Sequence, residues 1–412
     1  MLYIFLNNKL ITADTVLPLL VELRRRQPQL DMQFICFEPK TEAAIRENVV
    51  VFDAMSELGP LRMLGRRSTG PGAFFAHRGG MFIRMVLMAL RACMGRAAFL
   101  HFKALNEWPL RLLALVARGR TFYMQPSNLV HSATERRVDE INKPRRRSKI
   151  VPAAGHLVGF DNDWLPLSDP RLERAEIHVL PSPNRLRIWH EHVDAVTQRY
   201  LSEVYADSAI PEQIAAYILS SMDRAPLLAD PDSFKPMFEE TLQLLYRANP
   251  GLSVLIKPHP ATKPGIRQFQ NEVVARQQAS GQDVRIVHLH PMVLARSANF
   301  FIGNMFSSTF SNAAVMGVPT IEYTSYSNET LGESGGQSIR PDLVSHFIDR
   351  DQGVLQALLT QVQGWGPRLN APDLVGSEPS LEHWITTVSR LAGKPLPVHS
   401  SMNTNALPGA PR

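Results

Sequence analysis

The chain of 412 residues exceeds the ~100–200 residues of an ordinary domain, so the sequence predicts two domains. Its 44% hydrophobic and 20% charged residues are typical of a globular protein and exclude a disordered or fibrous one. The net charge of +6 combines a basic first part, with 24 Lys and Arg against 12 Asp and Glu in residues 1–150, and an acidic remainder with 20 against 26.

The basic first part favours an anionic partner, such as a membrane surface or an acidic glycan. Its positive charges include the runs 24–26, 66–67 and 144–149. A solvated basic face with no partner is an equally good interpretation. No aromatic residues interleave with the arginines and no nucleic-acid-binding module is recognisable, so nucleic acid is not an expected partner.

The N-terminus opens directly on a strand-like run. MLYIFLNNKL has no basic segment followed by a long apolar stretch, so a signal peptide is not expected. No run reaches ~18 consecutive apolar residues, which excludes an obvious membrane-spanning helix. Cys36 and Cys93 lie in apolar surroundings, which favours reduced thiols. We therefore expect the protein in the cytoplasm, either free or at the inner face of the membrane.

Strands and helices alternate through the first 125 residues. Apolar runs predict strands at 2–7, 32–37, 49–53, 97–105 and 121–125. Helices are predicted between them, one capped by Thr12 or Asp14, one over Thr41–Glu47 and one over 106–119. This alternation indicates parallel βαβ units, in which the carboxyl ends of the strands line the ligand crevice.

The segment between the third and fourth of these strands has a different character. Residues 60–80 are rich in glycine, proline and basic residues, which is typical of a mobile loop. The helix predicted over 81–94 is apolar on nearly all sides but carries Arg84 and Arg91. A packed core helix is the favoured interpretation. A membrane-surface helix is the alternative, because basic heads flank its apolar faces.

A charged and proline-rich stretch over 135–185 marks the interdomain connection. A helix over 189–207 then opens a second alternation, with strands predicted at 214–221, 253–260, 284–289, 300–303 and 319–323. The sequence thus predicts an α/β protein of two doubly wound, Rossmann-like domains that face a cleft. We place the domains at 1–170 and 171–393 and expect the polar, proline-rich tail 394–412 to be disordered.

One predicted strand ends in Lys257-Pro258-His259-Pro260. Proline fixes φ and cannot donate to the strand ladder, so pairing stops and His259 is held at the carboxyl end of the strand. In an open parallel sheet that end faces the crevice. A lysine point charge and an imidazole donor or general acid suit a phosphate or diphosphate there. A histidine that merely ends a strand is the less favoured alternative.

A serine pair, Ser307-Ser308, precedes the small-residue segment TFSNAAVM, which ends at Gly317 with Pro319 just beyond. Hydroxyls and backbone N–H groups at the start of such a helix converge on an anion, helped by the helix dipole. Between His259 and Ser307 the chain passes a helix, a strand, a helix and a strand, which brings both to one edge of the crevice. Serines that only cap the helix are the alternative.

Three further residues are candidates to border the same crevice. Glu322 ends the strand after the serine helix and is a candidate to accept hydrogen bonds from ribose hydroxyls, with a plain surface glutamate as an equal alternative. Ser220 and Ser221 follow the first strand of the second domain and are candidates for phosphate or sugar contacts.

These motifs resemble those of GT-B glycosyltransferases that use CMP-activated sugars: bacterial sialyltransferases, polysialyltransferases and capsule Kdo transferases, with CDP-glycerol polymerases as relatives. The likeness rests on Lys257-Pro258-His259-Pro260 and on Ser307-Ser308 with the following AAVMGVPTIEY. It covers roughly residues 214–325, and the N-terminal half only as architecture. It implies that His259 and the serine pair bind the CMP phosphate and that His259 assists nucleotide departure. UDP-sugar 2-epimerases share a similar fold and serine helix and remain a rival.

The resemblance also implies a general base on the acceptor side, at the carboxyl end of a strand of the first domain. The acidic-acidic-Gly motif that supplies this base in some of these transferases is absent. The candidates are Asp14, Asp53, Glu107 and His131, of which we favour Glu107 and then Asp14. Helix capping by Asp14 and stabilisation of a first helical turn by Glu107 are the structural alternatives.

The resemblance therefore implies a glycosyltransferase that moves a sialic-acid- or Kdo-like sugar from a CMP-linked donor, held by the second domain, to a surface glycan or lipid-linked acceptor at the first. The donor is a substrate and no cofactor is expected. No metal is expected either, because histidine, lysine and a helix dipole neutralise the departing phosphate and no metal-ligand cluster is apparent in the sequence. The alternatives are a UDP-sugar 2-epimerase-like enzyme, a CDP-glycerol-type transferase and a non-catalytic polysaccharide-assembly protein.

Overall fold

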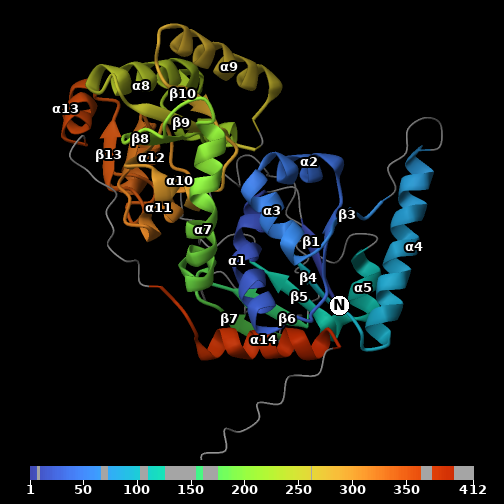
Figure 1. Ribbon diagram of the computed structural model, residues 1–412. Coiled ribbons are helices and arrows are strands. Elements are labelled where there is room, and N and C mark those ends of the chain that lie inside the picture. Colours follow the sequence, from blue (N-terminus) through green and yellow to red (C-terminus); the bar gives the residue numbers. More distant parts are fainter. Residues whose placement is uncertain are drawn as a thin grey trace, which may run out of the picture.

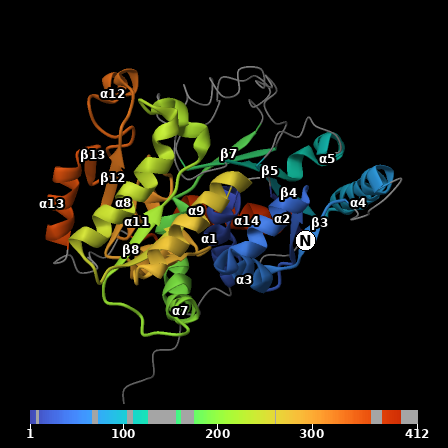
Figure 2. The same cartoon turned by 90° about the horizontal axis from the view of Figure 1, so that it is seen from above.

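The computed structural model describes residues 1–6, 10–65, 73–102, 110–125, 155–160, 175–260, 262–362 and 374–393. Two α/β domains lie side by side, and the long helix α7 (Arg187–Val204) packs against helices of both (Figures 1 and 2). Each domain is built on a parallel sheet, as the alternation of strands and helices predicts.

The first sheet has seven parallel strands in the order β3-β2-β1-β4-β5-β6-β7. They span β1 Leu2–Leu6, β2 Met32–Cys36, β3 Leu61–Met63, β4 Ala98–His101, β5 Thr121–Met124, β6 His156–Gly159 and β7 Glu176–Val179. Every residue of β1 and β4 is buried, because helices cover both faces of the sheet. The strand order reverses between β1 and β4, and this is where a doubly wound sheet opens its crevice.

The helices of the first domain divide between the two faces of its sheet. They are α1 Leu10–Arg26, α2 Pro39–Glu47, α3 Val49–Leu58, α4 Ala73–Cys93, α5 Leu110–Val116 and the 3-10 turn η1 Arg118–Arg120. Leu2, Ile4 and Leu6 of β1 pack on the face that carries α1 and α3. Tyr3 and Phe5 point the other way and pack on α4 and α5, as the two-residue period of a strand requires.

The second sheet has six parallel strands in the order β10-β9-β8-β11-β12-β13. They span β8 Ile214–Ile218, β9 Ser253–Lys257, β10 Val284–Ile286, β11 Phe300–Gly303, β12 Thr320–Thr324 and β13 His346–Asp349. Five of these strands were predicted from the sequence, and β13 was not. The order reverses between β8 and β11, which places the crevice of this domain beside the ends of β9, β8 and β11.

The helices of the second domain also cover two faces. They are α8 Phe234–Ala248, α9 Pro264–Ala279, α10 Pro291–Ser297, α11 Phe310–Val315, α12 Asn328–Ser334 and α13 Gln352–Val362, with the 3-10 turns η4 Pro183–Arg185, η5 Met222–Leu227 and η6 Pro231–Ser233. Helices α8, α9 and α13 pack on one face of the sheet. Helices α10 and α11 pack on the other, in a core that continues through α7 into the first domain.

The prediction of a strand over 49–53 is wrong, because these residues begin helix α3. The Asn48 side chain accepts a hydrogen bond from the Val51 N–H at 3.2 Å and caps the helix. Buried residues then recur at helical spacing, at positions 50, 51, 54, 55 and 58. The β-branched run suggested a strand, but packing of this apolar face against α1 decides for the helix. The third strand is instead β3, within the predicted loop 60–80.

Strands β6 and β7 lie within the stretch 135–185, which the sequence predicts to be the interdomain connection. β7 pairs with β6 in the first sheet and lies beyond the boundary placed at residue 170. Each strand is only four residues long, so neither produces a clear periodic signal in the sequence.

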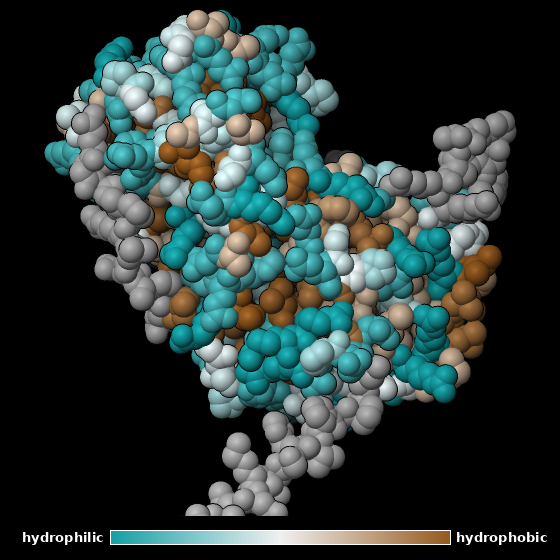
Figure 3. All heavy atoms as spheres, in the orientation of Figure 1, coloured by the Kyte–Doolittle hydropathy of each residue, from teal (hydrophilic) through white to brown (hydrophobic). Residues whose placement is uncertain are grey.

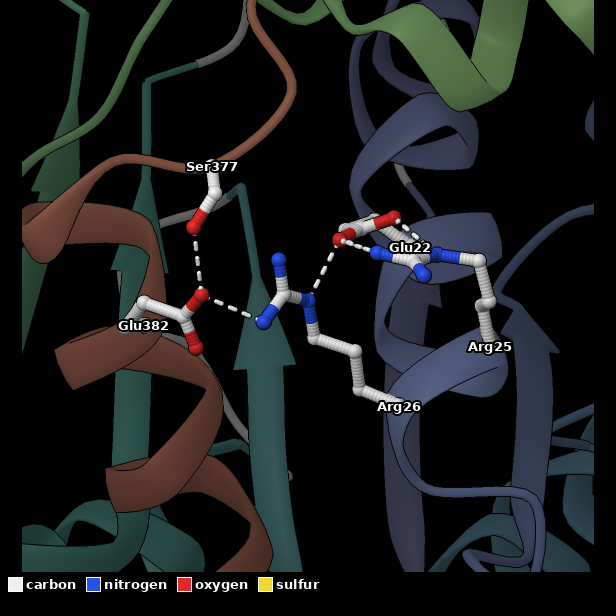
Figure 4. Close-up of polar contacts among 5 residues, drawn as sticks. All are labelled: Glu22, Arg25, Arg26, Ser377 and Glu382. Atoms are coloured by element: carbon white, nitrogen blue, oxygen red, sulfur yellow. Dashed lines mark hydrogen bonds and ion pairs between the residues drawn. The ribbon is translucent and has the colours of Figure 1, made fainter.

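Helix α14 (Pro379–Leu391) returns from the second domain and packs against the first (Figure 1). Arg26 at the end of α1 donates to both Glu22 and Glu382, and Ser377 donates to Glu382 at 2.7 Å (Figure 4). The Met1 amino group donates to the Ala392 carbonyl at 2.7 Å. The last described helix therefore belongs to the surface of the first domain. The tail 394–412, predicted to be disordered, lies outside the described residues.

Helix α4 includes the predicted helix 81–94 and begins earlier, at Ala73. Met85, Met88 and Ala89 are buried against the first sheet. The opposite side of α4 exposes an apolar stripe, so the predicted core helix is buried on one side only. Across the described segments, no helix combines the length and apolar character needed to cross a membrane.

Candidate functional site

A pocket lies between the two domains, beside the end of β9. It is lined by Leu10, Ala44, Glu47 and Asn48 of the first domain and by Lys257, Pro258, His259, Pro260, Arg267 and His288 of the second. The space within the pocket, about 290 Å³, includes open solvent. The Lys-Pro-His-Pro segment thus borders a cleft to which both domains contribute.

His259 is held by the turn that follows β9. Pairing with the neighbouring strands ends at Lys257, and Pro258 is buried while His259 is partly exposed. The His259 carbonyl accepts hydrogen bonds from the N–H of Thr262 at 3.0 Å and from its hydroxyl at 2.6 Å. The backbone is therefore fixed while the side chain borders the pocket.

Lys257 is buried, and its ammonium donates to the Leu289 carbonyl at 2.8 Å. Burial lowers the pKa of Lys257, and the carboxylates of Asp14 and Glu47 oppose this shift. Both carboxylates belong to the first domain, on α1 and α2. The lysine is therefore the positive centre that acidic side chains of the other domain face.

Asp14 lies on α1, and its carboxylate faces His290 and Lys257 of the second domain. Its Oδ1 is 3.7 Å from Nε2 of His290, and its side chain retains 23% of its exposure. Burial raises the pKa of Asp14 to about 7, and the charge of Lys257 limits that rise. A carboxyl group with this pKa exchanges protons near neutral pH.

The tautomer of His290 follows from its capping role. Its Nδ1 accepts the Met292 N–H at 3.1 Å at the start of α10, so the neutral ring carries its proton on Nε2, the atom nearest Asp14. Burial and the nearby charge of Lys257 lower the pKa of His290 to about 3, so the ring is neutral at physiological pH. The edge of His290 also packs on Trp189 of α7, which fixes its orientation.

The backbone at Asp14 is also unusual. Helix α1 begins at Leu10, earlier than the predicted caps Thr12 and Asp14, so Asp14 is an interior residue of the helix. Pro18 follows four residues later inside the same helix. It has no N–H to bond to the Asp14 carbonyl, and a proline at such a position bends or weakens a helix. The helix is therefore locally interrupted at the residue that faces His290 and Lys257.

Glu47, at the end of α2, links the domains across the pocket. Its Oε1 lies 3.3 Å from Nη1 of Arg267 on α9 and 3.3 Å from Nε2 of His288. All three side chains are about one-third to two-fifths exposed, so each contact is weak by itself. Together they hold the two walls of the pocket close to each other.

Ser307 and Ser308 lie in the turn before α11, which is only six residues long. Ser307 is buried and its hydroxyl accepts the Thr309 N–H at 3.4 Å, while Ser308 is partly exposed. The strand order β9-β8-β11 puts this turn and His259 at the same edge of the sheet, one strand apart. Neither serine lines the pocket described above.

Ser220 supports the turn that carries Ser307 and Ser308, called the serine turn below. Its hydroxyl donates to the carbonyls of Met305 and Phe306 at 2.8 and 3.0 Å. Gly303 allows the two strands to approach here, because a Cβ at this position would lie 3.0 Å from the Ile218 carbonyl oxygen. Ser220 is thus a buried support of the loop, and Ser221 beside it is partly exposed.

Glu322 also reaches the serine turn through a partner. It is fully buried, and its Oε1 accepts a hydrogen bond from the Tyr326 hydroxyl. The same hydroxyl accepts the Phe306 N–H at 3.2 Å. The structure therefore places Glu322 and Ser220 around the residues that precede Ser307.

Two of the four base candidates, Glu107 and His131, lie outside the described residues. Asp53 lies on α3 and pairs with α7, accepting hydrogen bonds from Arg199 at 2.8 Å and from the Tyr200 hydroxyl at 2.6 Å. This is an interhelical contact remote from the pocket lining. Of the described candidates, Asp14 is the one that faces Lys257.

The sequence did not indicate His290, His288, Glu47 or Arg267. The two histidines belong to VRIVHLHP, which ends in His290-Pro291. This pair repeats the His-Pro of Lys257-Pro258-His259-Pro260 and is a local signal that could have indicated the site. Glu47 and Arg267 carry no local signal, because their pairing depends on how the domains meet.

Comparison with known proteins shows similarity of structure only. No protein-family model and no curated protein matches the sequence. UDP-GlcNAc 2-epimerase from Neisseria meningitidis bound to UDP-GlcNAc superposes with a TM-score of 0.55 at 11% identity, over 94% of this chain and 98% of that one. UDP-GlcNAc 2-epimerase from Methanocaldococcus jannaschii superposes with a TM-score of 0.54 at 10% identity, also over 94% of this chain and 98% of that one. The glycotransferase of kitacinnamycin superposes with a TM-score of 0.45 at 12% identity, over 95% of each chain.

At these identities the similarity concerns the fold and not the activity. Two doubly wound parallel sheets, joined through α7 and facing a common cleft, are what the sequence predicted. The chain has a GT-B-type fold, the architecture of UDP-GlcNAc 2-epimerases.

Proposed function

We propose that this protein is a nucleotide-sugar-dependent glycosyltransferase whose reaction takes place in the interdomain cleft, with Asp14 as the base. The observation that carries the proposal is the Asp14 carboxyl group, which has a pKa of about 7 and faces Lys257 and His290 across the domain boundary. A base is most effective when its pKa lies near the working pH. Perturbed carboxyl groups in clefts are characteristic of active sites.

On the donor side, the proposal assigns the phosphate of a CMP-linked sugar to His259 and the serine turn. His259 borders the pocket at the end of β9, and Ser307-Ser308 follow β11 at the same sheet edge. Imidazole and hydroxyl groups, with the positive charge of Lys257 behind them, suit a departing phosphate. The choice of CMP rests on the resemblance of these two motifs to those of CMP-sugar transferases.

The reaction balances as a single displacement. Asp14 takes the proton of the acceptor hydroxyl while the oxygen of that hydroxyl forms a bond to the anomeric carbon of the sugar. The bond between that carbon and the phosphate oxygen breaks, and CMP leaves with the electron pair. His259 donates a hydrogen bond or a proton to the phosphate, so the new negative charge forms beside donors already in place.

The acceptor is proposed to be a glycan or a lipid-linked molecule at a membrane surface. Helix α4 exposes Ile83, Leu87 and Leu90, spaced four and three residues apart, and Met94 follows directly after its end. These side chains form one stripe with exposed fractions of 54–60%. Leu115 of the adjoining helix α5 is 73% exposed. Figure 3 shows apolar side chains gathered over α4 at the edge of the molecule. A basic domain that displays such a stripe suits an anionic bilayer.

The membrane contact is tested by sedimentation with vesicles of phosphatidylcholine and phosphatidylglycerol. The wild type is expected to bind, and Leu87→Glu/Leu90→Glu to lose most of that binding. Val354→Glu is the matched control, because Val354 is 52% exposed on α13 of the other domain. Equal binding by all three proteins, or none by the wild type, would overturn the membrane assignment.

A sugar-nucleotide 2-epimerase is the second candidate, favoured by the fold similarity to two UDP-GlcNAc 2-epimerases. An epimerase binds UDP and acts without an acceptor. The transferase proposal rests on the cytidine-type motifs and on a base that the first domain supplies and that faces the second.

Calorimetric titration with CMP, CDP and UDP separates these candidates. We expect CMP or CDP to bind more tightly than UDP, and His259→Ala to weaken the binding by roughly 10-fold or more, as the loss of a charge-assisted hydrogen bond predicts. Preference for UDP would support the epimerase. Absence of cytidine nucleotide binding, or binding unchanged in His259→Ala, would contradict the assignment of the donor site.

A further inference from the structure

Three imidazoles and a carboxylate meet at the amino edge of the first sheet. His156 is the first residue of β6, and Glu176 and His178 lie on the adjacent strand β7, with His156 in register with Glu176. His383 of α14 lies against them, with its ring stacked on His178 at a centroid distance of 5.5 Å. These positions are at the opposite end of the sheet from the carboxyl edge that forms a ligand crevice.

The distances within this cluster match the first coordination sphere of a metal ion. Nδ1 of His156 is 3.3 Å from Nε2 of His178 and 3.3 Å from Oε2 of Glu176, and Nε2 of His178 is 3.7 Å from Oε1 of Glu176. Within the described residues, these three side chains offer ligand atoms that all lie within 4.8 Å of one another. Tetrahedral ligands bound at ~2.1 Å are separated by about 3.4 Å.

Hydrogen bonding alone leaves one contact unfavourable. Nε2 of His156 lies 3.2 Å from the Gly119 carbonyl, which can only accept, so the neutral ring carries its proton on Nε2 and presents a lone pair from Nδ1. That lone pair faces both the Glu176 carboxylate and Nε2 of His178. One proton on His178 satisfies one of these contacts and not the other, whereas a cation between the three atoms satisfies both.

The Gly119 carbonyl also has the role that an outer-shell acceptor has in metal sites. Metal-ligating histidines usually donate their second N–H to a carbonyl or carboxylate, which fixes the tautomer and the ring plane. The ring of His156 is further held by stacking on Phe122 at 4.3 Å. His156 and His178 are buried, while Glu176 and His383 are 38% and 62% exposed, so an ion can enter from the α14 side.

We propose that His156, Glu176 and His178 bind a divalent transition-metal ion of the zinc type, with His383 of α14 as the fourth ligand. Nitrogen ligands with one carboxylate suit Zn²⁺ better than Mg²⁺ or Ca²⁺, which prefer oxygen. Nε2 of His383 bonds to Oε1 of Glu176 at 2.6 Å, which places this imidazole beside one of the three ligands. The ion would tie α14 to strands β6 and β7, a structural role separate from the interdomain cleft.

Zinc titration of the untagged, chelator-treated full-length chain tests the proposal. We expect one equivalent of Zn²⁺ to bind and to raise the melting temperature, and Co²⁺ to give visible absorption typical of a nitrogen-rich tetrahedral site. Glu176→Gln and His178→Asn are expected to lose both effects, and His383→Asn to weaken the affinity by roughly 10- to 100-fold, in the range seen when metal-site residues are removed. His346→Asn, on β13 of the second domain, is the control and is expected to bind as the wild type does.

Circular dichroism of each metal-free variant distinguishes loss of the site from loss of the fold. If His178→Asn unfolds, the exposed partners Glu176 and His383 still decide the question. Absence of Zn²⁺ binding by the folded wild type, or equal binding by wild type, Glu176→Gln and His383→Asn, would overturn the proposal and leave the cluster as a hydrogen-bonded contact between α14 and the sheet.

Discussion

Asp14 is the residue on which the proposed chemistry depends, and its surroundings are set by both domains. Its own helix is interrupted by Pro18, and the neutral His290 and the buried Lys257 come from the other domain. Burial disfavours the carboxylate, and the lysine charge favours it. The balance leaves the proton equilibrium of Asp14 close to neutral pH.

This raised pKa predicts a stability cost that depends on pH. The pKa of Asp14 is about 7 in the folded chain and ~3.9 in an unfolded one, so folding takes up a proton between these values and stability falls as pH rises from about 4 to about 7. Asp14→Asn removes this cost. We expect the variant to be more stable than the wild type above pH 7, by at most about 4 kcal/mol, and the difference to shrink toward pH 4. Thermal melts across pH check this, and parallel profiles for the two proteins would contradict it.

Lys257 is predicted to tune the same group. Removal of its positive charge in Lys257→Met leaves burial unopposed, so the pKa of Asp14 is expected to rise above about 7. The acid limb of the pH–rate profile for CMP release then moves to higher pH. Lys263→Met, at an exposed lysine beside the same loop, is the control and is expected to leave the limb in place. An unshifted limb in Lys257→Met would show that another group titrates.

At the level of single residues, the sequence was informative where chemistry and backbone constraint coincide. Two prolines around His259 end the strand and put Lys257 and His259 beside the pocket, and both follow from local sequence alone. His290 and Glu47 could not be found in this way, because their significance arises only where one domain faces the other. The serine turn was located, but Ser220 and Glu322 support it from buried positions that spacing does not reveal.

Among the elements, α14 shows how a distant segment completes the first domain. Glu22 of α1 is buried beside Arg25 and Arg26 (Figure 4). Burial by itself would raise the pKa of Glu22, but hydrogen bonds from the two arginines outweigh it and hold that pKa below its usual value. Arg26 also donates to Glu382, so one guanidinium joins α1 to α14.

Loss of that guanidinium is predicted to destabilise the chain. Arg26→Met leaves the buried Glu22 with one cationic partner and detaches Glu382, so we expect a loss of about 1–2 kcal/mol in the free energy of unfolding. Arg25→Met is the matched variant, since Arg25 also pairs with Glu22 but is 52% exposed, and its hydrogen bonds go to Glu22 rather than to α14. Urea unfolding measures both. Equal effects of the two substitutions would argue against a bridging role for Arg26.

The element predictions succeeded where strands are apolar and buried on both faces. The apolar runs of β1, β2, β8, β9, β11 and β12 are all visible in the sequence. The run VVVFD has the same composition but forms α3, because Asn48 caps it and its apolar face packs on α1. Short edge strands such as β7 and β13 were missed, since four residues of mixed burial carry little periodicity.

In the whole molecule, the two domains meet through a continuous core and through a few polar contacts across the pocket. Residues of β1, α1, α7, α10 and α14 belong to one hydrophobic cluster. In the pocket between the domains, Glu47 contacts Arg267 and His288. The core fixes how the domains are joined, and these polar contacts favour a closed cleft.

Glu47→Gln is therefore predicted to favour a more open molecule. Two partly exposed contacts are worth about 0.2–1 kcal/mol each, so we expect nucleotide affinity to fall by roughly 2- to 30-fold. Small-angle X-ray scattering of the ligand-free protein should show a larger radius of gyration than that of the wild type. Glu239→Gln breaks an ion pair with Arg276 within the second domain and is the control. An unchanged radius in Glu47→Gln would contradict a role in closure.

The central claim is that the interdomain cleft transfers a sugar from a CMP-linked donor with Asp14 as the base. Release of CMP from CMP-linked sialic acid and Kdo, measured with a glycan acceptor for the wild type and for Asp14→Asn, tests it most directly. We predict acceptor-dependent release by the wild type and a fall of roughly 100-fold or more in Asp14→Asn, as removal of a general base predicts, with CMP binding retained. Release that does not depend on the acceptor, or that is undiminished in Asp14→Asn, would contradict the claim.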